Sequence, residues 1–235
     1  MRISDINFFY INCKKDIEKN KLIQEQWNEC CIYYNKIILQ RWDAVHFEDY
    51  VYPYFTEFNV PDNSKIKDTI SNIAVFKSHS NLWKYVWDNQ IKYAFILEDD
   101  SIIPRTFLKD LENILDEGHP DEWDVLYFGI LRMMAKKTKI SNSFYKVLDT
   151  KGYNNGLHAY LINQKTAGKF LKLISEIGPE NQIDIFIRDR ASQFNLWVYK
   201  DLLIKQDVDK FESTRLGRMV KDEFKNTFDE INVLE

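Results

Sequence analysis

Three consecutive carboxylates, Glu98, Asp99 and Asp100, directly follow the apolar run at residues 93–97 (YAFIL). A continuous apolar run of this length is typical of a central parallel strand that is covered on both faces. Open parallel sheets bind ligands at the carboxyl ends of their strands, where these three side chains would lie. Adjacent carboxylates repel one another, and a divalent cation relieves the repulsion while bridging to phosphate oxygens. The triplet suits a metal that holds a diphosphate, although a solvated acidic turn or a helix N-terminus explains it equally well.

The composition indicates a globular chain that forms one α/β domain over residues 1–235. Hydrophobic residues make up 45% and aromatic residues 15% of the chain, which is enough for a substantial core and excludes an intrinsically disordered protein. The net charge is −4, and no long basic block is present. A nucleic-acid partner is therefore not expected, because binding to a phosphate backbone needs clustered lysine and arginine.

The sequence shows no sign of export or of a membrane span. Residues 1–5 lead directly into a strand-like run without the features of a signal peptide, and no apolar stretch reaches the roughly 20 residues that cross a bilayer. Cys13, Cys30 and Cys31 are odd in number and lack metal-ligand spacing, which favours reduced thiols. We expect a cytoplasmic protein, either free or peripherally attached to a membrane.

Apolar residues recur alternately with strand and helix periodicity along the chain. We predict strands at residues 6–11, 36–40, 93–97, 123–128, 145–148, 158–162 and 196–205. We predict helices at 17–33, from 64 to about 86, 104–115, 166–177 and 183–194, with loops at 46–63 and 136–139 and a partly helical tail from 213. The alternation predicts a mostly parallel central sheet with helices on both faces, which is a Rossmann-like α/β fold.

Two motifs stand at a characteristic separation. Ser78, His79 and Trp83 give Ser-His-x-x-x-Trp on a predicted helix, and residues 96–100 read ILEDD at the end of the next strand. This combination resembles glycosyltransferase family 25, which includes bacterial lipopolysaccharide glycosyltransferases and animal procollagen galactosyltransferases. Further similarity covers most of the chain, at residues 10–12, 42–45, 123–129 and 158–162. The chain departs from the family pattern at residues 71–72, where Ser-Asn replaces Gly-Glu, and at residues 14–15, where lysines replace common arginines.

The resemblance implies a GT-A-type fold and a metal-dependent enzyme that inverts the anomeric carbon. Glu98 and Asp100 would hold Mn²⁺ or Mg²⁺, and Asp99 would belong to the donor site. The donor would be a nucleotide sugar, a UDP-hexose carrying galactose or glucose, and the acceptor a hydroxyl of a glycan or glycosylated protein. Residues 1–130 would form the nucleotide-sugar-binding half and residues 131–235 the acceptor-side half.

Five further residues are candidates for donor binding. Asn12 ends the first strand, where its amide either contacts the nucleotide or forms a turn. Asp43 would accept hydrogen bonds from uracil or ribose while the small Ala44 lets the base approach, or Asp43 only caps a loop. Ser78 and His79 lie on the long helix, and His79 would either contact the ribose or phosphate or organise the triplet.

Inverting transfer requires a general base that removes the acceptor hydroxyl proton. We predict Asp184 as that base, because it lies in the region where family members carry an acidic residue before an aromatic one; a helix N-cap is the alternative role. Asp189 is the reserve candidate. Additional donor contacts are expected near the last strand and acceptor contacts near the loop before residue 158, namely at Gln206, Asp207, Asp209, Ser213, Thr214, Asn154, Asn155 and His158.

Two other classes of protein remain as alternatives. One is a catalytically silent domain of the same fold that serves as a binding or interaction module. The other is a metal-dependent nucleotidyltransferase, which would normally carry a glycine-rich phosphate loop. Only seven glycines occur in the chain, and they form no such cluster.

Overall fold

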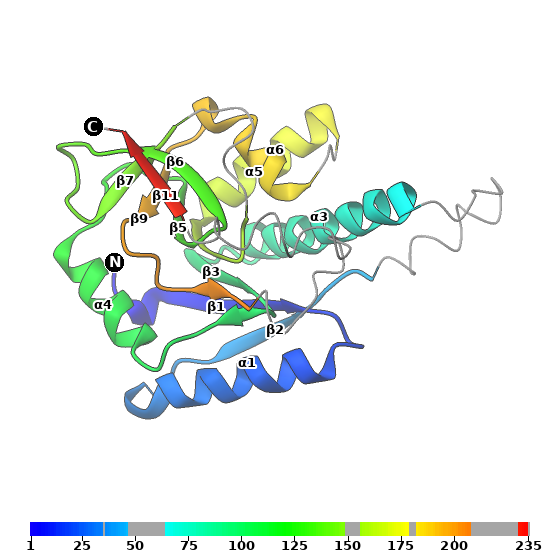
Figure 1. The fold of residues 1–235 in the computed structure, drawn as a ribbon, viewed down its shortest axis with the longest axis horizontal. Helices are drawn as coiled ribbons and strands as arrows, with labels where there is room; N and C mark the ends of the chain where they lie inside the picture. The colour runs from blue at the N-terminus through cyan, green and yellow to red at the C-terminus, as the bar shows by residue number, and fades with distance from the viewer. Residues whose placement is uncertain (35, 47–63, 149–155, 179–181, 208–229, 235) are drawn as a thin grey trace.

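The computed structural model describes residues 1–34, 36–46, 64–148, 156–178, 182–207 and 230–234 (Figure 1). Residues 47–63 of the predicted loop at 46–63 lie outside the described residues. The same is true of the acceptor candidates Asn154 and Asn155 and of the donor candidates Asp209, Ser213 and Thr214. None of the helices in the described ranges has the length and apolar character that a bilayer crossing requires.

Within the described residues, a nine-stranded sheet forms the centre of the protein in the order β11-β6-β7-β9-β5-β8-β3-β1-β2. Its strands are β1 Ile6–Asn12, β2 Leu39–Asp43, β3 Tyr93–Glu98, β5 Val125–Gly129, β6 Arg132–Lys136, β7 Phe144–Val147, β8 Ala159–Asn163, β9 Leu196–Tyr199 and β11 Glu230–Leu234. In this described sheet β7 and β8 run opposite to the other strands, which share one direction. The prediction of a mostly parallel sheet is therefore confirmed.

Helices cover both faces of the sheet (Figure 1). One face packs against α1 Ile17–Cys30 and α4 Phe107–Glu117. The other face packs against α3 Ser64–Asp88, α5 Gln164–Ile177 and α6 Ile183–Arg188. Each covering helix contributes large apolar side chains to one of two continuous cores, which confirms the predicted three-layer α/β architecture.

Strand β3 lies between β1 and β8, and its apolar residues are fully buried. Alternate side chains point to opposite faces, so Phe95 packs on the α1 and α4 side and Ile96 on the α3 side. This strand ends in the acidic triplet. A short antiparallel pair, β4 Ser101–Ile102 with β10 Lys205–Gln206, then brings the late segment of the chain next to the triplet.

Several element boundaries differ from the sequence-based predictions. The second strand begins at Leu39 instead of Lys36, because its pairing with β1 runs from Phe8↔Leu39 to Asn12↔Asp43. Strand β6 was not predicted, since its Arg and Lys ends resemble a surface loop. The predicted helix at 183–194 stops at Arg188 and gives way to a short 3-10 turn at Ala191–Gln193. The predicted strand at 196–205 is two strands, β9 and β10.

Phe95 offers a test of the core beneath the triplet. Its ring is fully buried and lies 5.3 Å from the ring centroids of both Phe107 and Phe128. Phe95→Ala leaves a cavity and is expected to lower the free energy of unfolding by about 3–5 kcal/mol, measured by urea denaturation. Tyr33→Ala is the control, because Tyr33 is 91% exposed and its loss should change stability by less than about 0.5 kcal/mol. Equal effects of the two variants would contradict this description of the core.

Candidate functional site

Each carboxylate of the triplet contacts a different segment of the chain. Glu98 faces α3, Asp99 faces β1 and α1, and Asp100 faces β10. The backbone turn itself is held by β8, because the Glu98 amide donates to the His158 carbonyl at 2.9 Å. The sequence places the three carboxylates side by side, and the fold then gives each one a separate environment.

Asp99 is the carboxylate with a cationic partner. The Asn12 amide nitrogen donates to Asp99 Oδ2 at 2.7 Å, and Lys19 Nζ of α1 lies 3.3 Å from Asp99 Oδ1. Burial raises the pKa of Asp99, while Lys19 and Asn12 act in the opposite direction. Burial alone would lower the pKa of Lys19, but the charges of Asp99 and Asp100 raise it above its usual value. The ammonium group of Lys19 therefore stays charged and compensates the middle carboxylate.

Among the described residues, the hydrogen-bond donors to Asp100 are neutral. The Gln206 amide nitrogen donates to Asp100 Oδ2 at 2.9 Å, and the Asp207 amide donates to the Asp100 carbonyl at 2.8 Å. The other carboxylate oxygen, Oδ1, is buried and has no hydrogen-bond partner. Burial and the neighbouring charge of Glu98 raise the pKa of Asp100 to about 7. An unsatisfied buried carboxylate oxygen is costly, so this atom is a candidate contact for a cation or donor group.

Glu98 ends a chain of buried hydrogen bonds that starts in the core. The indole N–H of Trp83 donates to the Tyr160 hydroxyl at 2.9 Å, and that hydroxyl lies 2.8 Å from His79 Nδ1. His79 Nε2 lies 3.3 Å from Glu98 Oε1. Since Trp83 can only donate, the Tyr160 hydroxyl is free to donate to Nδ1, which leaves Nε2–H to donate to Glu98.

His79 is 1% exposed, so the described contacts favour the second of its two predicted roles, which was to organise the triplet. Ser78 is also buried, and its hydroxyl donates to the Ala74 carbonyl and accepts from the Val45 amide at 2.8 Å. Ser78 thus holds the chain after β2 against α3. Direct contact of either side chain with a nucleotide stays a prediction.

A second polar network joins Asn12 to the end of β2. Arg41 Nε donates to Asn12 Oδ1 at 2.8 Å, and Arg41 and Lys14 lie 3.1 and 3.3 Å from the two carboxylate oxygens of Asp43. Because Asn12 also donates to Asp99, its amide connects Asp43 to the triplet. The structure therefore brings Asn12, Asp43 and Asp99 together. Arg41 and Lys19 complete the network, and no sequence motif indicated either of them.

An open cleft of about 620 Å³ lies beside this network. Its described lining consists of Cys13, Lys14, Lys15, Asp43, Ala44, Val45 and His46. The volume falls in the range of small-molecule sites. Asp43 and Ala44, two of the predicted donor contacts, line the cleft. Lys14 and Lys15 add positive charge to the lining.

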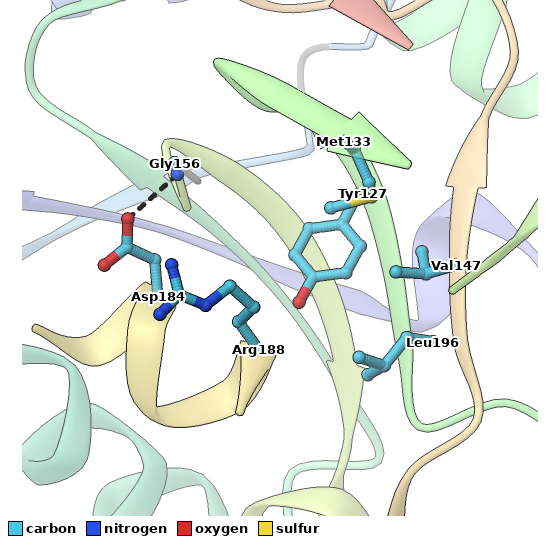
Figure 2. Close-up of a pocket in the computed structure, with 7 residues that line it drawn as sticks. All are labelled: Tyr127, Met133, Val147, Gly156, Asp184, Arg188 and Leu196. Carbon is cyan, nitrogen blue, oxygen red and sulfur yellow. Dashed lines mark hydrogen bonds between the residues drawn. The ribbon is translucent and has the colours of Figure 1, made fainter. Parts of the chain in front are cut away.

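Asp184 occupies a different position, at the start of α6 (Figure 2). One carboxylate oxygen accepts from the Gly156 amide and the other from the Ile185 amide, both at 2.9 Å. Gly156 adopts a φ of +90°, which favours glycine. Asp184 and Arg188 line a water-sized cavity of about 10 Å³ together with Tyr127 (Figure 2). Burial and the charge of Asp184 raise the pKa of the Tyr127 hydroxyl.

Asp184 is not in contact with the triplet. Tyr127, Tyr160 and Ile96 lie in register across β5, β8 and β3, so the strand that carries Tyr127 is two strand spacings, about 10 Å, from β3. The reserve candidate Asp189 pairs with Arg188 at 2.8 Å, as expected for a surface ion pair. The assignment of the general base stays a prediction.

Among the residues that the structure describes, no three His, Cys, Asp or Glu side chains form a ready-made metal cluster. The residues nonetheless fit a hard divalent cation, because Asp100 presents a buried oxygen without a partner next to a second carboxylate. Oxygen ligands of this kind suit Mg²⁺ or Mn²⁺, which are commonly held by one or two carboxylates together with substrate phosphates.

The fold matches that of a solved glycosyltransferase. The crystal structure of a glycosyltransferase involved in the glycosylation of the major capsid of PBCV-1 superimposes with a TM-score of 0.50 and 9% identity, covering 89% of this chain and 96% of the other. This chain thus has a glycosyltransferase fold. A family model described as Glycosyltransferase family 25 (LPS biosynthesis protein) matches residues 5–187. The chain belongs to glycosyltransferase family 25.

The sequence relatives include an animal galactosyltransferase and a viral envelope protein. Human procollagen galactosyltransferase 2 is 24% identical over 150 residues, which cover 63% of this chain and 24% of that protein. The envelope protein OPG108 of Monkeypox virus is 24% identical over 192 residues, which cover 72% of this chain and 54% of that protein. The chain thus matches about a quarter of the first protein's length and about half of the second's.

The raised pKa of Asp100 predicts a pH dependence of stability. In metal-free protein, the folded state holds this proton up to about pH 7, whereas the unfolded chain releases it near 3.8. Asp100 therefore makes the protein less stable as the pH rises between those values, by at most about 1.4 kcal/mol per pH unit. Asp100→Asn cannot ionise and still accepts from Gln206, so it should remove this contribution and be more stable than the wild type at pH 8.

Urea denaturation in EDTA at pH 5 and pH 8 measures the effect. Asp116→Asn is the control, because Asp116 is exposed on α4 and should leave the pH dependence unchanged. The same pH dependence in Asp100→Asn and in the wild type would show that Asp100 titrates normally.

Proposed function

We propose that this chain transfers a hexose, galactose or glucose, from a UDP-sugar to a hydroxyl of a glycan or glycosylated protein, with inversion and with a divalent cation. The observation that carries the proposal is the buried, unpartnered Oδ1 of Asp100 at the carboxyl end of the central strand β3. Parallel sheets bind ligands at this edge. Membership of glycosyltransferase family 25 supports a sugar nucleotide as the ligand.

The cleft beside β1 and β2 is the proposed nucleotide site. Asp43 accepts hydrogen bonds from uracil or ribose, and the small Ala44 leaves room for the base to approach. Lys14 and Lys15 favour the negative charge of the diphosphate. The Asn12 amide then links this cleft to Asp99, so that the nucleotide and the triplet are aligned by one hydrogen-bonded network.

Glu98 and Asp100 are the proposed cation ligands. When bound, Mn²⁺ or Mg²⁺ supplies positive charge that stabilises the diphosphate as the sugar departs. Asp99 is occupied by Asn12 and Lys19, which assigns it a supporting role in the donor site. His79 fixes the orientation of Glu98 through Nε2, as an outer hydrogen-bond partner does for many metal ligands.

Asp184 is the proposed general base. A carboxylate has about four lone-pair positions, and the contacts with the Gly156 and Ile185 amides use two of them. The remaining positions are available to a hydroxyl proton.

A binding module without catalytic activity is the second candidate function. The similarity to a protein named as a viral envelope protein favours it. Both candidates predict UDP binding, so the deciding measurement is turnover. Calorimetry with UDP, with and without Mn²⁺, followed by an assay of UDP release from UDP-galactose and UDP-glucose, separates them. UDP binding without release from either sugar would favour the binding module.

Asp100→Asn tests the metal assignment. The change keeps the shape of the side chain and removes its charge, so UDP release should fall by roughly 10²–10³-fold, and Mn²⁺ should no longer strengthen UDP binding in calorimetry. Asp121→Asn is the matched control, because Asp121 is exposed and belongs neither to the triplet nor to the cleft lining. It should behave as the wild type. Unchanged turnover in folded Asp100→Asn would rule out this ligand.

Asp184→Asn tests the base. The amide oxygen can still accept from the Gly156 amide, so the local structure should persist, while the loss of proton transfer should lower kcat by roughly 10²–10⁴-fold. Donor affinity should not change, because Asp184 is remote from the cleft. Asp116→Asn, at an exposed residue of α4, serves as the control. If kcat survives in Asp184→Asn, or falls equally in both variants, another group removes the proton.

A further inference from the structure

His158 is a buried residue that touches the triplet turn through its backbone. Its side chain is 0% exposed, so it does not face an acceptor as the sequence suggested. Its carbonyl accepts from the Glu98 amide at 2.9 Å and from the Ser101 hydroxyl at 3.1 Å. These donors lie on either side of Asp99 and Asp100. The His158 backbone therefore fixes both ends of the acidic turn.

The imidazole of His158 points to a different segment. Its Nε2 lies 3.2 Å from the Ile204 carbonyl; because a carbonyl only accepts, Nε2 carries the proton and donates. Burial lowers the pKa of His158, so the ring is neutral at neutral pH. Nδ1 is consequently a buried acceptor, and it has no hydrogen-bond partner.

Gly129 makes room for this arrangement. A Cβ atom at residue 129 would lie 2.6 Å from His158 Nε2 and 2.7 Å from the Ile204 carbonyl oxygen. Ile204 is also held by β5, because its amide donates to the Phe128 carbonyl at 3.0 Å. The end of β5, the His158 ring and Ile204 therefore pack in direct contact.

The segment that follows Ile204 carries the partners of Asp100. Lys205 and Gln206 form β10, which pairs with β4 directly after the triplet. Gln206 donates to Asp100 Oδ2 at 2.9 Å, and the Asp207 amide donates to the Asp100 carbonyl at 2.8 Å. The position of Asp100 Oδ1 thus depends on where Gln206 holds the carboxylate, and the position of Gln206 depends on Ile204.

We infer that His158 is a positioning residue for Asp100: its Nε2–H anchors Ile204, and this anchor sets Gln206 against the carboxylate. The inference rests on the proposed function only in giving Asp100 a cation to bind. The anchoring contact itself is a property of the chain alone and is open to measurement without any donor or metal. Loss of such outer hydrogen-bond partners typically lowers metal affinity or activity by roughly 10–100-fold.

His158→Gln and His158→Asn form a matched pair of test variants. The amide nitrogen of Gln reaches about as far as Nε2, so Gln should retain the bond to Ile204, whereas the shorter Asn should not. Native-state hydrogen exchange of metal-free protein should show faster exchange of the Ile204 and Asp207 amides in His158→Asn than in His158→Gln. Equal exchange at both amides in the two variants would overturn the anchor, whether or not the protein is an enzyme.

The dependence of UDP release on Mn²⁺ tests whether the Ile204 anchor acts on Asp100 through Gln206. The Mn²⁺ concentration for half-maximal UDP release should rise roughly 10-fold or more in His158→Asn and stay near the wild-type value in His158→Gln. In the Gln206→Ala background, His158→Asn should add little, because the partner through which it acts is gone. An equally large added effect in that background would show that His158 does not act through Gln206. If the wild type releases no UDP, the proposed function fails while the exchange result stands.

Discussion

The site depends on one electrostatic constraint, which is that three adjacent carboxylates follow a strand buried on both faces. Their mutual repulsion and their partial burial both disfavour the charged forms. The fold provides each carboxylate with separate contacts. His79 contacts Glu98, Lys19 and Asn12 contact Asp99, and Gln206 contacts Asp100. The turn is therefore stabilised only when α1, α3 and the β10 segment are all packed around β3.

Compensation of the three negative charges is unequal across the triplet. Asp99 receives an ammonium group and an amide, which oppose the rise that burial causes in its pKa. Asp100 receives one neutral amide on its side chain and retains a buried oxygen without a partner. Strongly perturbed carboxylates of this kind concentrate at functional sites. The electrostatics thus distinguish the second carboxylate, which has a cationic partner, from the third, which keeps a buried oxygen without a hydrogen-bond partner and is our proposed cation ligand.

The sequence was sufficient to predict the layers of the fold and the position of the acidic triplet at the end of a buried central strand. The apolar run of β3 and the helical spacing in α4 and α5 are local signals, and the structure contains all three elements. The partners of the triplet are not local, since Lys19 and Gln206 lie 80 and 106 residues from the carboxylates they contact. No spacing rule relates such residues, because sheet order and register decide which side chains meet. Strand β6 was missed for a related reason, as its pairing with β7 and β11 outweighs its charged ends.

The rigidity of the triplet and its strain have the same physical origin. Phe95 and Ile96 anchor β3 in the two cores, and the flanking strands β1 and β8 leave it no freedom to shift. That same burial withholds water from Asp100 and raises its pKa. If β3 were less tightly packed, water would reach the Asp100 carboxylate and remove the cost of its burial. Oδ1 would then also be free to move. Under the proposed function, the burial that fixes Oδ1 for the cation therefore also makes the metal-free state less stable than the core beneath it would allow.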